Sequence, residues 1–124
     1  MLKYKKRIYK YVVTEDISVP HPLLEGYKVD RPYYNIKDGV ATAKEGYHWD
    51  GASGPTIDTP NTMLPSLIHD IFYQSIRAGA IPSEDRITGD KILYDLLIQE
   101  GMSKLRAKLW YFFVSKFAGY TARK

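Results

Sequence analysis

The chain has 124 residues, of which 44% are hydrophobic and 26% charged, and it contains no cysteine. This length and composition predict one folded domain over residues 1–124 rather than two domains or a disordered chain. Without cysteine, disulfide bonds and thiolate metal sites are excluded, so any metal would bind to oxygen or imidazole ligands.

The formal net charge is +4, and Lys and Arg are concentrated at residues 3–10 and 104–124. Such clusters suit an anionic partner, either a nucleic acid or a lipid surface, although solvated basic ends are the simpler explanation. No recognised nucleic-acid-binding motif accompanies the charge. The basic N-terminus has no apolar run behind it, and no apolar stretch reaches the ~18 residues that span a membrane. We therefore expect neither a signal peptide nor a transmembrane segment.

Strand patterns fill residues 1–50. Polar and apolar residues alternate over residues 3–14, which predicts one strand with a solvated face. Short apolar and Tyr-rich runs follow at residues 27–29, 33–36 and 40–43, and the Lys37-Asp38-Gly39 break before the last run is typical of a hairpin. This part is expected to form a small antiparallel sheet or meander.

Helical patterns fill residues 64–119, after a loop at residues 51–63. Three helices are predicted at residues 64–78, 84–100 and 103–118, and they end at Gly79, Gly101 and Gly119. Apolar residues cover more than half of the third helix, which favours either a central core helix or an assembly surface. Because strands precede helices, the pattern predicts an α+β fold.

The first predicted helix carries His69, Asp70 and Tyr73. Residues four apart share a helix face, so His69 and Tyr73 are neighbours, whereas Asp70 points about 100° away. A buried imidazole needs a hydrogen-bond partner, and Asp90 on the second helix is the candidate. Asp90 lies on an apolar stripe with Ile87, Tyr94 and Leu97, where an unpaired carboxylate is costly.

An Asp that orients a His, whose other ring nitrogen faces a cleft, is the usual arrangement of a catalytic base. The alternative is a polar clamp between two core helices, without any catalytic role.

The loop Trp-Asp-Gly-Ala-Ser-Gly-Pro at residues 49–55 can turn several backbone groups toward one point, because its glycines permit positive φ. With Asp50 and Asp70 as carboxylates, this loop would suit a hard cation such as Ca²⁺. A tight strand-to-helix connection is the simpler alternative. The loop lacks the Gly-Lys-Ser/Thr ending of a phosphate-binding loop.

Several of these strings together resemble a family of short phage and prophage proteins, catalogued as domain of unknown function 1353. The strings are Trp-Asp-Gly-Ala-Ser-Gly-Pro, Leu-Ile-His-Asp-Ile-Phe-Tyr, Arg-Ile-Thr-Gly-Asp and the helix between Gly101 and Gly119. The resemblance covers residues 40–119. It implies a phage or prophage origin, hence a location in the virion or the host cytoplasm, but no activity.

His-Asp-x-x-Tyr on a helix, between a Gly-rich loop and a later Asp, is also similar to secreted and parvoviral phospholipases A2. That resemblance implies a calcium-dependent ester hydrolase. His69 would be the base, Tyr73 and Asp90 would hold it, and Asp70 would bind Ca²⁺ with a loop that includes Gly51 and Gly54. The loop departs from the family's Gly-x-Gly pattern, and the cysteines of the secreted members are absent.

A third pattern, with His48, His69, Asp70 and Asp90 in order, resembles metal-dependent phosphohydrolases of the His-Asp type. His48 lies in a strand-like stretch, whereas those enzymes place their ligands on helices, so this interpretation is the least favoured.

Two functional hypotheses follow. One is a calcium-dependent, phospholipase A2-like hydrolase that works on an anionic lipid surface. The other is a non-enzymatic virion component of a tail, baseplate or capsid, in which the polar cluster stabilises the fold and aromatic surfaces contact other phage structural proteins.

Overall fold

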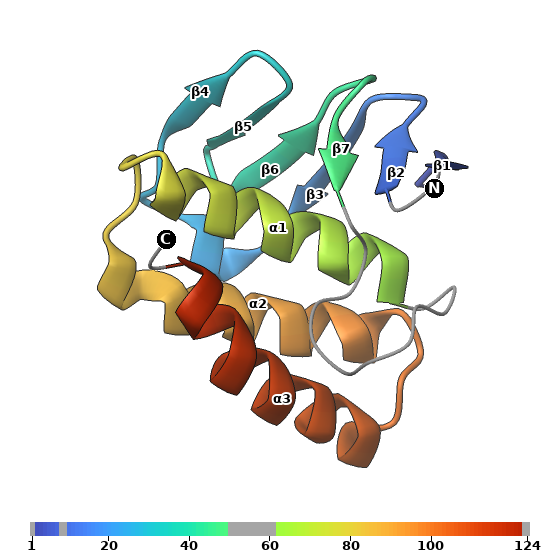
Figure 1. The fold of residues 1–124 in the computed structure, drawn as a ribbon, viewed down its shortest axis with the longest axis vertical. Coiled ribbons are helices and arrows are strands. Elements are labelled where there is room, and N and C mark those ends of the chain that lie inside the picture. Colours follow the sequence, from blue (N-terminus) through green and yellow to red (C-terminus); the bar gives the residue numbers. More distant parts are fainter. Residues whose placement is uncertain (1, 8–9, 50–61, 123–124) are drawn as a thin grey trace. The chain divides into compact units, whose positions relative to one another are not determined.

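The structure, a computed structural model, describes residues 2–7, 10–49 and 62–122. The chain divides into two compact units, Met1–Asp50 and Gly51–Lys124. Among the described residues, the strands lie in the first unit and the three α-helices lie in the second (Figure 1). The predicted α+β class, with antiparallel strands followed by three helices, is confirmed.

The strands of the first unit form two antiparallel sheets rather than one. The first sheet has the order β1-β2-β7, and the second has the order β3-β6-β5-β4. The strands are β1 Tyr4–Arg7, β2 Lys10–Val13, β3 Ile17–Pro20, β4 Val29–Arg31, β5 Tyr34–Lys37, β6 Val40–Ala43 and β7 His48–Trp49. Between β3 and β4, the short 3-10 helix η1 spans Pro22–Leu24.

The prediction of one strand over residues 3–14 is wrong. The segment folds back on itself, and β1 pairs antiparallel with β2 so that Tyr4 faces Val13 and Arg7 faces Lys10. Alternation alone missed the break because it continues across both strands, and no Gly, Pro or Asn interrupts it.

The hairpin predicted at Lys37-Asp38-Gly39 is confirmed. Strands β5 and β6 pair antiparallel, with Lys37 opposite Val40, so Asp38 and Gly39 form a two-residue turn. Both turn residues have positive φ, 52° and 75°, as a type I′ turn requires. A Cβ at Gly39 would lie 2.6 Å from Glu25 Oε1, but that atom ends an exposed, flexible side chain that can move aside, so the positive φ is what favours glycine here.

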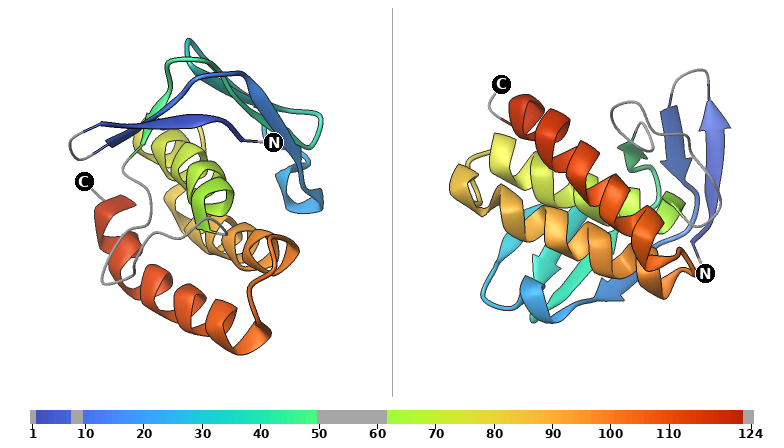
Figure 2. Two further views of the ribbon diagram at one scale, coloured as in Figure 1. Left: turned by 90° about the vertical axis from the view of Figure 1, so that its right-hand side faces the viewer. Right: turned by 90° about the horizontal axis from the view of Figure 1, so that it is seen from below.

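The second unit contains helices α1 Met63–Arg77, α2 Arg86–Gln99 and α3 Lys104–Ala122, with the short 3-10 helix η3 at Ser83–Asp85. Figure 2 shows the three α-helices side by side, and α2 contacts both α1 and α3. Gly79 and Gly101 have φ of 80° and 99°, the left-handed conformation that ends a helix. The predicted end at Gly119 is wrong, because α3 continues through it. None of the described helices is long and apolar enough to cross a membrane.

Among the described residues, α1 is more buried than α3, although the sequence pattern favoured the third helix as a core helix. Helix α1 is buried around most of its circumference, including Leu67, Ile68 and Phe72. Helix α3 buries Ala107, Trp110 and Val114 but leaves its opposite side exposed. The interpretation of the third helix as the central core helix is therefore wrong, because its apolar residues fall on two opposite faces and the structure covers one of them.

Candidate functional site

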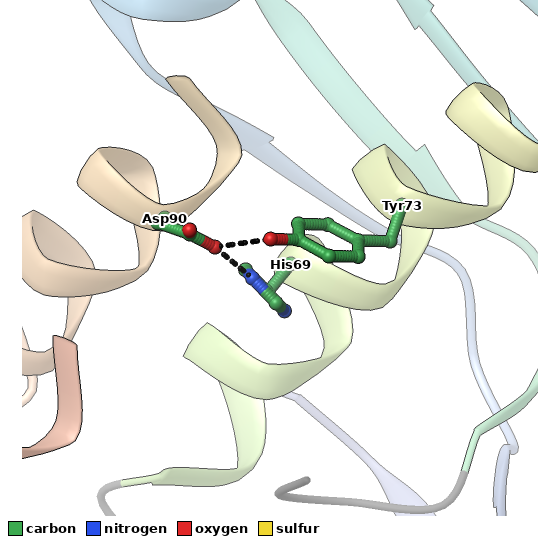
Figure 3. Close-up of polar contacts among 3 residues, drawn as sticks. All are labelled: His69, Tyr73 and Asp90. Atoms are coloured by element: carbon green, nitrogen blue, oxygen red, sulfur yellow. Dashed lines mark hydrogen bonds and ion pairs between the residues drawn. The ribbon is translucent and has the colours of Figure 1, made fainter. Parts of the chain in front are cut away.

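The polar cluster of the second unit joins His69 and Tyr73 of α1 to Asp90 of α2 (Figure 3). His69 Nε2 lies 2.7 Å from Asp90 Oδ1, and the Tyr73 hydroxyl donates a 2.7 Å hydrogen bond to the same oxygen. The predicted contact between His69 and Asp90 is confirmed. These distances are typical of charge-assisted hydrogen bonds.

The cluster is buried. Asp90 has no exposed surface, and His69 and Tyr73 are 7% and 3% exposed. The rings of His69 and Tyr73 also pack against each other, with centroids 4.2 Å apart and planes inclined by 35°. Spacing i, i+4 on α1 places the two rings one above the other, so the helix itself sets the geometry with which they meet Asp90.

The pKa of the Tyr73 hydroxyl is raised well above its ordinary value. Burial is the main cause, because it disfavours the phenolate, and the Asp90 carboxylate adds repulsion and a hydrogen bond to the neutral form. The Arg86 guanidinium, one turn before Asp90 on α2, opposes this rise. Tyr73 therefore remains a hydrogen-bond donor throughout the neutral pH range.

The second oxygen of Asp90 distinguishes the cluster from a fully satisfied polar clamp. Asp90 Oδ2 is buried and has no hydrogen-bond partner among the described residues. An unsatisfied buried carboxylate oxygen is costly, and most buried polar atoms in proteins have a partner. The cluster therefore retains capacity to accept one more hydrogen bond.

Close packing of α1 and α2 brings Asp90 to His69. Gly89 is buried, and a Cβ built on it would lie 2.7 Å from Cδ1 of Phe72, which is shorter than real Cβ contacts. Phe72 is itself 1% exposed and precedes Tyr73. Glycine at position 89 thus allows the backbone of α2 to approach the α1 side chains closely enough for Asp90 to reach its partners.

One part of the Asp90 prediction is wrong. Ile87, which was expected on the same buried stripe, is 47% exposed. The buried positions of α2 are Gly89, Asp90, Ile92, Leu93, Leu96 and Leu97. Asp90 is still on the buried face of α2, but that face begins one turn later than the stripe predicted.

Of the four predicted metal ligands, only Asp70 lies among the residues that the structure describes. Asp50, Gly51 and Gly54 lie outside the described residues. Asp70 is partly exposed, and its Oδ2 accepts a 3.2 Å hydrogen bond from Gln74 Nε2. Its carboxylate is the kind of ligand that calcium takes, but calcium needs six to eight oxygens.

Within the described part of the chain, no three His, Asp or Glu side chains gather as a metal site would require. The described residues alone therefore do not form a calcium site, and the prediction depends on the segment around Asp50.

His48 lies on β7 and is exposed. The strand position expected for it is confirmed. It belongs to the first unit, whereas His69, Asp70 and Asp90 belong to the second.

Two residues of the site were absent from the sequence-based set. Gly89 lies inside the predicted helix at residues 84–100, where glycine is unfavourable, and this signal could have revealed a close approach. Arg86 precedes Asp90 by four residues, the spacing of a helical ion pair. Its interaction with the Tyr73 hydroxyl does not follow from that spacing, because Tyr73 lies on another helix.

Comparison of the chain with protein-family models, with curated proteins and with solved structures finds no match. The three motif resemblances therefore receive no support from these comparisons, and the geometry of the His69, Tyr73 and Asp90 cluster is the remaining basis for a function.

Proposed function

We propose that the second unit carries an ester hydrolase site in which His69 is the general base. The observation that supports it is the 2.7 Å contact between His69 Nε2 and Asp90 Oδ1, with Tyr73 bound to the same oxygen. A carboxylate only accepts hydrogen bonds, so it favours the tautomer of His69 that carries its proton on Nε2. The free lone pair is then on Nδ1, which points away from Asp90 (Figure 3).

In this mechanism His69 Nδ1 takes a proton from a water molecule as the oxygen of that water attacks the ester carbonyl carbon. The tetrahedral intermediate then breaks its bond to the leaving alkoxide, and His69 returns the proton to that oxygen. The products are a carboxylic acid and an alcohol, and no covalent enzyme intermediate forms. Asp90 and Tyr73 act as positioning residues, because they hold the imidazole in one orientation and one tautomer.

Calcium is the proposed cofactor, with Asp70 and the segment of the second unit that includes Gly51 and Gly54 as its ligands. When bound, the ion would stabilise negative charge on the ester carbonyl oxygen. Support for it comes from the oxygen chemistry of Asp70 and from the motif resemblance to phospholipases A2. The proposed substrate is accordingly a phospholipid ester.

The test is release of fatty acid from phosphatidylglycerol micelles by the purified chain, with millimolar calcium and with a chelator. His69→Gln should lower the rate about 10²- to 10⁴-fold while the circular dichroism spectrum is retained. His48→Gln is the matched control, because His48 is an exposed histidine of the first unit, and its rate should equal that of the wild type. Wild-type protein that releases no fatty acid under either condition would refute the hydrolase proposal.

A second candidate is a non-enzymatic virion component, and two observations favour it. The His69 side chain is only 9% exposed, which suits a structural clamp, and α3 presents exposed aromatic side chains at Phe112 and Phe113. If this candidate is correct, His69→Gln lowers the melting temperature but changes no hydrolytic rate. Asp70→Asn separates the two further, because only the hydrolase requires that partly exposed carboxylate.

A further inference from the structure

Helix α3 has an exposed apolar face, here called the α3 outer face, made of Leu105, Leu109, Phe112 and Phe113. These side chains are 74%, 53%, 53% and 38% exposed. Their spacing of four, three and one residues places them on one side of the helix. The Phe112 and Phe113 rings touch edge to face, with centroids 5.8 Å apart. Large apolar side chains that gather in this way mark an interaction site.

The opposite side of α3 is the side that packs within the helical unit. Ala107, Trp110 and Val114 are at most 5% exposed. Tyr111, on the edge of this side, packs edge to face against Tyr94 of α2. The α3 outer face is therefore not the side by which the helix packs within its own unit.

Charge decides which partner fits the outer face. Four exposed cations, Lys104, Arg106, Lys108 and Lys116, lie along the same helix, and residues 104–124 contain no Asp or Glu. On the helical circle, Lys104 and Lys108 lie beside one edge of the apolar stripe and Arg106 beside the other, while Lys116 falls in line with the stripe, beyond its C-terminal end at Phe113. Residues 62–103 show the reverse balance, with three Lys or Arg and six Asp or Glu. The positive charge of the described helical unit is thus concentrated beside its exposed apolar stripe.

We propose that the α3 outer face docks on an anionic lipid surface. An apolar stripe with cations at both edges and at its C-terminal end matches the interface of such a membrane, because the stripe enters the acyl boundary while the cations meet lipid phosphates. A second copy of the chain is a poorer partner, since its α3 would bring cations against cations and would have no acidic residue to pair with them. The proposal goes beyond the hydrolase proposal, because the face would bind lipid whether or not His69 is a base.

The test is co-sedimentation of the full chain with vesicles, in the presence of a chelator so that binding is measured without calcium. Phosphatidylglycerol vesicles should bind the protein at least tenfold more tightly than phosphatidylcholine vesicles, and added salt should weaken the binding. Leu109→Gln should weaken it about tenfold, because one large apolar side chain no longer enters the interface. Lys108→Gln should weaken it about fivefold.

Matched controls are available on α2. Ile87 is 47% exposed and Lys91 is exposed, so Ile87→Gln and Lys91→Gln make the same chemical changes away from the α3 outer face. Both controls should bind like the wild type, and the chelator keeps this test separate from the test of calcium-dependent hydrolysis.

Three results would overturn the proposal. They are absence of binding to phosphatidylglycerol vesicles, equal binding to both lipids, or equal losses for Leu109→Gln and Ile87→Gln. If vesicles are not bound and the chain forms oligomers that Leu109→Gln dissociates, the face binds a second copy and the lipid assignment is wrong.

Discussion

Of the substitutions predicted below, Asp90→Ala should lower the free energy of unfolding the most. Asp90 Oδ1 accepts hydrogen bonds from His69 and Tyr73, and each hydrogen bond to a charged group contributes about 1.5–3 kcal/mol. Asp90→Ala removes both bonds, and it also removes the cost of a buried carboxylate whose Oδ2 has no described partner. We expect a net loss of about 3 kcal/mol in the free energy of unfolding.

A double-mutant cycle with Tyr73→Phe tests this reasoning. Tyr73→Phe alone should cost about 1.5–2 kcal/mol, because one bond to Asp90 is lost. In the Asp90→Ala background the same change should cost almost nothing, because the hydroxyl has already lost its acceptor, which gives a coupling energy of about 1.5 kcal/mol or more.

Urea unfolding followed by circular dichroism measures all four proteins. Glu100→Ala is the control, because Glu100 is an exposed acid directly after α2, and it should change stability by less than ~0.5 kcal/mol. A loss below ~1 kcal/mol for Asp90→Ala, or strictly additive losses, would show that the cluster does not stabilise the helix pair.

Three further predictions concern pH and packing. Because the folded-state pKa of Tyr73 is raised above the unfolded value near 10, its stabilisation is complete below pH ~10 and is lost at higher pH, by about 1.4 kcal/mol per pH unit. Between pH 10 and 11, urea midpoints of the wild type should therefore fall more steeply than those of Tyr73→Phe, and parallel decreases would contradict this. Gly89→Ala should destabilise the protein by about 1–2 kcal/mol through contact with Phe72, and Phe72→Leu should relieve part of that loss; additive losses would contradict the close approach. Gly39→Ala should cost about 1–2 kcal/mol, because φ is 75° there, and thermal unfolding that leaves the melting temperature unchanged would refute the type I′ turn.

The sequence by itself determined the elements whose signals are local. The Asp38-Gly39 turn is fixed by the positive φ that both residues tolerate, and the ends of α1 and α2 are fixed by Gly79 and Gly101. The order of strands before helices then sets the α+β class. Local signals gave wrong predictions in two places. No turn residue marks the break between β1 and β2, and Gly119, which was expected to end the third helix, lies inside α3.

The cluster of His69, Tyr73 and Asp90 was partly determined in the same way. Spacing of four residues fixed the pairing of His69 with Tyr73, and the cost of burying a carboxylate predicted that Asp90 needs a partner. Only the tertiary structure showed that both α1 side chains share one oxygen of Asp90 and that the other oxygen has no described partner.

Tertiary packing also decided which apolar face of α3 is buried. The sequence makes this helix apolar over more than half of its circumference, so Trp110 and Phe112 are equally good core candidates by pattern alone. Packing within the helical unit buries Trp110 and leaves Phe112 half exposed. A helix has one side against its neighbours, and which side that is depends on the shape of those neighbours rather than on its own residues.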